Sequence, residues 1–389
     1  MEIDTYIGKE KWNFSDEIYQ KLTGIKVESN FNPEVQLKIV ELPGILKCKR
    51  LFGIFWSTPT FKDIDCNYLF RVYDNRNIDY VISSSSANTA EGVARVIQSY
   101  NKTLKKRAKA ILLVPEISSF KMDEKVINKN PYVKYVVLKN SNLDCARKVA
   151  LELKERIEKK LSVVLAGEDL KTAAYAQIGL ALKERDLLNE KSCIVQTVSG
   201  GVGPAGIIES AYKLNVKPKL LVVQPLDGNS APIVDVLNEH SKGRDPITLF
   251  NRKNFETPKV ETTLGSTKPI YGINKFVKYR ENGGIIYASY ISKEEIFENR
   301  DRILYLLIKH GLYQNREIGV KLFDLEKSGF IAFIGVIKSE NLIESENIIV
   351  NFTGRLLKFN DPVPKPAKPH IKFDETQGIS KLIDLLKLK

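Results

Sequence analysis

The chain has 389 residues, of which 43% are hydrophobic and 28% charged, and its net charge is +13. This length and composition are typical of a globular protein with two domains or one large two-lobed unit. Its basic residues are scattered among acidic ones, a pattern that favours an enzyme acting on anions over a nucleic-acid-binding protein. A basic binding protein without cofactor stays open as a further alternative.

No stretch approaches the roughly 18 apolar residues that would mark a membrane helix. The first residues carry acids where a signal peptide has a basic start and an apolar run. We therefore expect a cytoplasmic protein with no membrane partner and no nucleic-acid partner.

The cysteines and histidines are widely separated, and no C-x-x-C pair occurs. They are Cys48, Cys66, Cys145, Cys193, His240, His310 and His370. This spacing argues against a zinc site, a dense disulfide framework and a Ser-His-Asp triad, so we expect no bound metal.

Strands and helices alternate from about residue 79 to 240. Short apolar runs predict strands at 79–85, 109–115, 133–139, 161–167, 193–198 and 219–225. Apolar residues at helical spacing predict helices at 90–100, 143–160, 170–188 and 206–214. This alternation is the pattern of a mostly parallel sheet covered by helices on both faces.

The pattern weakens after Asp245, and residues 254–272 are predicted to be an irregular loop. A strand follows at 283–291, and then a helix that begins with Ser292 and Glu295 in a capping-box arrangement and ends at Gly311. A last strand ends at Thr353-Gly354, and a proline-rich linker at 361–370 leads to an amphipathic helix at 379–389. That helix is predicted to pack back on the chain or to serve an oligomer contact.

A glycine-rich turn between a predicted strand and a predicted helix, Ser199 to Gly206, is the strongest local signal for a ligand site. Glycines permit a tight turn, and a helix start offers N–H groups and a positive dipole end to a phosphate. Gly201, Gly203 and Gly206 also satisfy G-x-G-x-x-G, with Asp227 about twenty residues on. An NAD(P)-dependent oxidoreductase using this loop is therefore an alternative.

Four motifs in order resemble the pyridoxal-phosphate enzymes of fold type II, the tryptophan synthase β-subunit type, and within them threonine synthase. They are Phe61-Lys62-Asp63, the loop Ser85-Ser86-Ala87-Asn88-Thr89, the glycine loop, and Thr353-Gly354. The resemblance covers roughly residues 57 to 358 and implies an α/β, two-lobed fold. Each lobe would hold an open, mostly parallel sheet flanked by helices, with the cofactor in the cleft between the lobes.

The resemblance also implies roles for individual residues. Lys62 would form a Schiff base with pyridoxal 5'-phosphate and act as the base at the substrate's α-carbon. Asn88 would bind the cofactor's phenolic oxygen, and Thr353 would face the pyridine nitrogen and leave it unprotonated. The cofactor phosphate would lie at Gly200, Gly201, Val202, Gly203, Pro204, Ala205 and Gly206. The substrate carboxylate would meet Ser85, Ser86, Ala87 and Thr89.

By the same resemblance, the large cofactor-binding domain comprises residues 1–78 and 160–360. A smaller, mobile domain comprises residues 79–159, and the linker and final helix comprise residues 361–389. The family is commonly dimeric, which implies a homodimer here.

The implied function is a lyase or synthase that eliminates phosphate from a phosphorylated amino acid and adds a nucleophile, as threonine synthase does. A β-replacing or deaminating relative is the alternative, of the cysteate synthase, cysteine synthase or threonine dehydratase type. The chain departs from the family pattern at several places. Ile64 removes a structural charge beside the lysine, Ala87 stands where glycine is usual, and residues 313–322 are unfamiliar. Thr60 stands where serine is common, and Val202 and Pro204 stand where glycine or small polar residues are common. These departures leave the substrate open.

Overall fold

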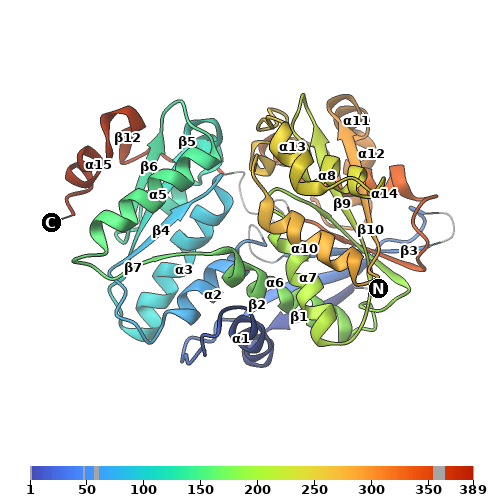
Figure 1. Cartoon of the computed structure of the whole chain (residues 1–389), viewed down its shortest axis with the longest axis horizontal. Helices are drawn as coiled ribbons and strands as arrows, with labels where there is room; N and C mark the ends of the chain where they lie inside the picture. Colours follow the sequence, from blue (N-terminus) through green and yellow to red (C-terminus); the bar gives the residue numbers. More distant parts are fainter. Residues whose placement is uncertain (1, 47–48, 57–60, 354–363, 389) are drawn as a thin grey trace. The chain divides into compact units, whose positions relative to one another are not determined.

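The computed structural model describes residues 2–46, 49–56, 61–353 and 364–388 (Figure 1). Within them the chain divides into two compact units. The first unit comprises residues 1–25, 34–61 and 171–363, and the second comprises residues 26–33, 62–170 and 364–389. Each unit contains its own sheet.

The sheet of the second unit has five strands, and every pairing in it is parallel. In spatial order they are β12 (Ile371–Phe373), β6 (Val133–Leu138), β5 (Lys109–Pro115), β4 (Tyr80–Ser84) and β7 (Val163–Leu165). The strands are short and nearly continuously apolar because helices cover the sheet.

Helices α3 (Asn88–Leu104) and α5 (Leu143–Ile157) both pack against β4 and β5. Side chains of alternate strand residues, such as Ile111 and Leu113, form one buried cluster with α5. The last helix, α15 (Ile379–Leu386), adds Leu382 and Leu386 to this cluster. The C-terminal segment therefore contributes both a strand and a helix to the second unit (Figure 1).

The sheet of the first unit has seven strands, of which three are antiparallel neighbours at one edge. In spatial order they are β1 (Glu2–Ile7), β2 (Val35–Glu41), β3 (Arg50–Trp56), β11 (Asn347–Asn351), β8 (Ser192–Thr197), β9 (Lys219–Leu226) and β10 (Ile286–Ser292). From β3 to β10 all pairings are parallel. Helix α14 (Ser328–Ser339) packs against β8, β9, β10 and β11.

The register places the carboxyl ends of β3, β11 and β8 at one edge of this sheet. Asn351 pairs with Ile54, and Val350 pairs with Val195. Side-chain hydrogen bonds join the three strand ends. Trp56 Nε1 donates to Asn351 Oδ1 at 3.0 Å, and Asn351 Nδ2 donates to Gln196 Oε1 at 3.2 Å. In open parallel sheets, this is the edge at which ligands bind.

The structure differs from the sequence prediction in two places. The helix predicted from Ser292 to Gly311 is divided into α11 (Lys293–Glu298) and α12 (Arg300–Lys309), although its capping box is present. Asn299 lies at the break, and its Nδ2 donates to the Glu295 carbonyl at 2.9 Å, which competes with the helical backbone bonds. Helix α10 (Ile270–Glu281) begins inside the stretch predicted to be irregular.

Among the helices that the structure describes, none combines the length and the apolar character needed to cross a membrane.

Candidate functional site

Lys62 lies immediately before helix α2 (Asp63–Val72), and its carbonyl accepts the N–H of Cys66 at 3.2 Å. The preceding residue, Phe61, stacks on Tyr175 with ring centroids 5.0 Å apart, so the backbone is anchored on both sides of the lysine. The Lys62 side chain is half-buried. Residues 57–60 of the lysine motif lie outside the described residues.

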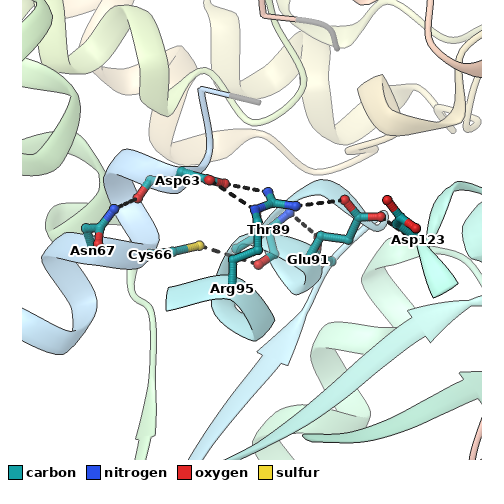
Figure 2. A network of polar contacts seen from close by, with 8 residues as sticks. Asp63, Cys66, Asn67, Thr89, Glu91, Arg95 and Asp123 are labelled. Carbon is teal, nitrogen blue, oxygen red and sulfur yellow. Dashed lines mark hydrogen bonds and ion pairs between the residues drawn. The ribbon is translucent and has the colours of Figure 1, made fainter. Parts of the chain in front are cut away.

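A charged network fixes the start of α2 against α3 (Figure 2). Arg95 on α3 contacts Asp63 through two hydrogen bonds, of 2.6 Å from Nη2 and 3.1 Å from Nε. Its Nη1 donates to Glu91 Oε2 at 3.1 Å. Both carboxylates are buried. Burial alone would lower the pKa of Arg95, but the charges and hydrogen bonds of Asp63 and Glu91 outweigh it and raise that pKa.

Arg95 supplies the positive charge that the sequence lacks at Ile64. The departure at Ile64 was expected to remove a structural charge beside the lysine, and the guanidinium reaches Asp63 from another helix instead. Sequence reasoning missed this residue. The available signal was Glu91 and Arg95 four residues apart on a predicted helix, a spacing that pairs them but gives no hint of Asp63.

Close packing brings the beginnings of α2 and α3 together in the second unit. Cys66 Sγ lies 3.4 Å from the carbonyl oxygen of Thr89 (Figure 2). A Cβ atom on Gly92 would lie 2.6 Å from the same sulfur, so only glycine fits there without a shift. The lysine and the predicted phenolic-oxygen ligand, Asn88, therefore start two helices that are locked to each other.

The serine-rich loop before α3 is held by its own hydrogen bonds. Ser85 donates its N–H to the Leu113 carbonyl, and Ser85 Oγ accepts the N–H of Thr89, both at 3.2 Å. Ser86 and Thr89 are half-buried, whereas Asn88 is buried. Ser85 thus satisfies one N–H at the start of α3, as an N-capping side chain does.

Ala87 adopts φ +92° and ψ −54°, in the region that favours glycine. The loop therefore has a glycine-like bend although the sequence has alanine, and the Cβ atom is accommodated with backbone strain. Although alanine replaces the usual glycine at position 87, the backbone there keeps the positive φ angle that glycine favours.

The glycine-rich loop begins helix α7 (Val202–Lys213), which has Gly201 at its N-cap with φ +80° and no capping side chain among the described residues. A Cβ on Gly201 would lie 2.8 Å from Gly272 Cα, and one on Gly203 would lie 2.2 Å from Gln196 Nε2. At Gly206 it would lie 2.7 Å from the Thr172 carbonyl oxygen. Packing against fixed backbone atoms therefore excludes a side chain at Gly201 and at Gly206, and the binding of a phosphate by this loop stays a prediction.

Thr353 follows β11 and is buried at the same sheet edge as the glycine loop. Its Oγ1 lies 3.1 Å from Thr197 Oγ1, the last residue of β8. It also donates to Ser328 Oγ at 3.3 Å, and Ser328 donates to Glu326 Oε1 at 2.7 Å. Sequence reasoning did not single out Ser328 or Glu326, because neither lies in a recognised motif. Gly354 lies outside the described residues.

Two other residues singled out from the sequence have structural contacts. Asp227 Oδ2 accepts the N–H of Val260 at 2.9 Å, so the carboxylate expected of a dinucleotide site holds a loop. Asn315, in the unfamiliar segment, caps α13 (Arg316–Leu325) by accepting the N–H of Ile318 at 3.0 Å. The oxidoreductase alternative stays a prediction.

No protein-family model and no curated protein sequence matches this chain. Solved structures do match it. A pyridoxal 5'-phosphate-dependent aspartate racemase is 13% identical with a TM-score of 0.58, over 89% of this chain and 95% of that one. A threonine deaminase from T.th. is 16% identical with a TM-score of 0.54, over 91% of this chain and 100% of that one.

A hydrogen sulfide-producing enzyme of Fusobacterium nucleatum is 15% identical with a TM-score of 0.55, over 82% of this chain and 94% of that one. At such identities the likeness establishes the fold. The predicted fold class, an α/β chain with two mostly parallel sheets flanked by helices, as in fold type II, is confirmed.

Proposed function

We propose that this chain is a pyridoxal 5'-phosphate-dependent enzyme that acts on an amino acid. The observation that carries this proposal is at the carboxyl edge of the first unit's sheet, where the start of α7 follows β8 and the buried Thr353 hydroxyl follows the adjacent strand β11. Support comes from the shared fold, which in one solved structure belongs to a pyridoxal 5'-phosphate-dependent racemase.

The protein groups at these positions match three chemical groups of the cofactor. A phosphate is favoured at the start of α7, where N–H groups and the positive end of the dipole are presented without a capping side chain. A ring nitrogen is matched by the buried hydroxyl of Thr353. An aldehyde is matched by Lys62, whose backbone is anchored by Phe61 and by the helix that follows.

When bound, the cofactor supplies an electron-withdrawing ring system to the substrate's α-carbon. Lys62 Nζ would hold the cofactor covalently and, once exchanged for the substrate's amine, would remove the proton from the α-carbon. Asn88 would donate to the phenolic oxygen, and the loop Ser85-Ser86-Ala87-Asn88-Thr89 would bind the substrate carboxylate. We expect this carboxylate to be recognised by hydroxyls and by backbone N–H groups.

On the basis of the sequence motifs we propose a specific reaction. It is the elimination of phosphate from a phosphorylated amino acid, followed by addition of a nucleophile, as in threonine synthase. Racemisation, deamination and β-replacement begin with the same removal of the α-proton, and the solved structures that share the fold include a racemase and a deaminase. The substrate therefore has to be found by assay.

The first experiment tests the covalent site. Purified protein supplied with the cofactor should absorb at the violet edge of the visible range, and borohydride should abolish that band and leave a mass adduct on the peptide containing Lys62. Lys62→Ala should lack the band and the adduct, whereas Lys148→Ala, which removes an exposed lysine on α5, should keep both. A cofactor-supplied wild type without band or adduct would overturn the proposal.

The second experiment tests the reaction with a substrate panel. O-phosphohomoserine should give phosphate and threonine if the finer proposal holds. Formation of 2-oxobutyrate from threonine, sulfide from cysteine or D-aspartate from L-aspartate would instead assign a deaminating, β-eliminating or racemising relative.

A further inference from the structure

The loop between the short helices η1 (Glu116–Lys121) and α4 (Glu124–Ile127) is held from two sides within the second unit. Its backbone is extended at Met122 and Asp123. In an extended chain, the Met122 carbonyl and the Glu124 N–H point to one side, and the Asp123 N–H points to the other. The two sides meet different partners.

One side of the loop meets residues 364–388, which we call the C-terminal strap. The strap donates the Ala367 N–H to the Met122 carbonyl at 2.7 Å. Its Lys365 carbonyl accepts the Glu124 N–H at 2.8 Å. Both backbone groups on this side of the loop are therefore bound by the strap.

Between these two hydrogen bonds, Asp123 and Pro366 form an antiparallel bridge. In such a pair the backbone groups of residue 366 point away from its partner, so proline loses no hydrogen bond to the loop. Farther along the strap, β12 pairs with β6, and α15 buries Leu382 and Leu386 against α5. The strap is thus fixed to the second unit both at the loop and at its final helix.

The other side of the loop meets the charged network beside the lysine (Figure 2). The Asp123 N–H donates to Glu91 Oε1 at 2.5 Å, while Glu91 Oε2 accepts Arg95 Nη1 at 3.1 Å. Arg95 in turn binds Asp63, the residue after Lys62. The Glu91 side chain therefore connects the loop to the network through its two oxygen atoms.

We propose that the C-terminal strap is a positioning element for the lysine region, which holds the 122–124 loop against Glu91 and so fixes the starts of α2 and α3. This inference rests on the proposed function. Lys62 and Asn88 would meet the cofactor's aldehyde and phenolic oxygen, which lie on adjacent ring positions. A shift of one helix start against the other would therefore change the cofactor's orientation.

Two variants loosen the strap from different ends. Ala367→Pro removes the N–H that the Met122 carbonyl accepts. Leu382→Ala removes a buried side chain by which α15 is anchored. Lys368→Pro is the matched control for the first, because Lys368 is exposed and its N–H makes no hydrogen bond within the part of the chain that the structure describes.

Hydrogen–deuterium exchange of the full chain without cofactor is the first measurement. In both strap variants, the amides of the 122–124 loop and of the first turns of α2 and α3 should exchange about fivefold faster, the effect of one lost hydrogen bond. Lys368→Pro should exchange as the wild type does.

Glu91→Gln should cut the connection, because its side chain has one acceptor oxygen where Asp123 and Arg95 each need one. In this background, Ala367→Pro should still speed exchange in the loop but should add no further effect at the start of α2.

Circular dichroism of the cofactor band at the violet edge, divided by the absorbance of that band, is the second measurement. A smaller folded fraction leaves this ratio unchanged, whereas a shift of Lys62 relative to Asn88 changes it. We expect a changed ratio in both strap variants and the wild-type ratio in Lys368→Pro.

Wild-type exchange at the starts of α2 and α3 in both strap variants, or a wild-type ratio in both, would overturn the inference and leave the proposed function intact. An effect of Lys368→Pro as large as that of Ala367→Pro would also overturn it. A wild type that binds no cofactor would overturn both.

Discussion

Two regions of the molecule use different kinds of polar contact. The lysine region of the second unit, at the starts of α2 and α3, uses charged groups, whereas the threonine region of the first unit, around Thr353, uses mainly hydroxyl groups. Around Lys62, two buried carboxylates share one arginine through three hydrogen bonds. Around Thr353, three neutral hydroxyls stand in line and a single carboxylate ends the chain. The first arrangement joins two helices through charged groups, and the second joins two strands and the start of α14 through uncharged hydroxyl groups.

The two kinds of contact differ in how much free energy is lost when they are broken. Buried charges in bidentate contact are costly to separate, so the start of α2 is tied firmly to α3. Hydroxyls cost less to bury and reverse direction easily. We therefore expect substitutions in the lysine network to lower the free energy of unfolding more than substitutions near the hydroxyl chain do.

Removing the arginine should break the lysine region and have the largest effect. Arg95→Met leaves Asp63 and Glu91 buried without their countercharge, and we expect a loss of roughly 3 to 5 kcal/mol in the free energy of unfolding. Urea denaturation measures it. Arg316→Met, which removes an arginine from an exposed pair with Asp301, should leave the free energy of unfolding nearly unchanged, because solvent screens that pair.

The double variant Arg95→Met/Asp63→Asn should recover part of that loss, because one of the two stranded charges is gone. Equal losses for Arg95→Met and Arg316→Met would mean that the charged network does not secure the two helices.

The next largest loss of stability is expected in the first unit, from a methyl group added at Gly206 on α7. Its Cβ would lie 2.6 Å from Tyr175 Cβ and 2.7 Å from the Thr172 carbonyl oxygen, and neither atom can swing aside. We expect Gly206→Ala to lower the free energy of unfolding by roughly 2 kcal/mol after the usual gain from alanine in a helix. Gly167→Ala, where nothing lies within 4 Å, is the control.

The same substitution at Gly92 sharpens the comparison, because there the added Cβ would meet side-chain atoms, Cys66 Sγ at 2.6 Å and Asp63 Oδ1 at 3.0 Å. A side-chain end can rotate away, so Gly92→Ala should cost less than Gly206→Ala, roughly 1 kcal/mol by urea denaturation. Adding Cys66→Ala should remove most of that clash. A larger loss at Gly92 than at Gly206 would contradict the ordering.

The smallest change is expected to stabilise the protein. Ala87 has φ +92°, and Ala87→Gly should relieve the strain at a small cost in chain entropy and buried methyl surface, for a net gain of up to about 1 kcal/mol. Ala90→Gly, also fully buried but inside α3, should instead destabilise by about 1 kcal/mol. Thermal unfolding of both variants checks the sign, and a loss at both positions would rule out strain at Ala87.

The sequence by itself determined the features that depend on neighbouring residues. Alternating strand and helix patterns predicted the parallel sheets, and the Ser292–Glu295 capping box predicted a helix start that the structure contains. The order of the lysine, serine, glycine and threonine motifs predicted the fold class. These signals are local, because periodicity, caps and turns involve residues within a few positions of each other.

Only the tertiary structure decided how distant residues combine. Arg95 meets Asp63 from 32 positions away, and Thr353 meets Thr197 from 156 positions away. Glu326 gained its place in the hydroxyl chain because α14 begins beneath two strands that are far from each other in the sequence. Side-chain hydrogen bonds and ion pairs extend only a few ångströms, and no pattern along the chain specifies which distant residues the fold brings within that range.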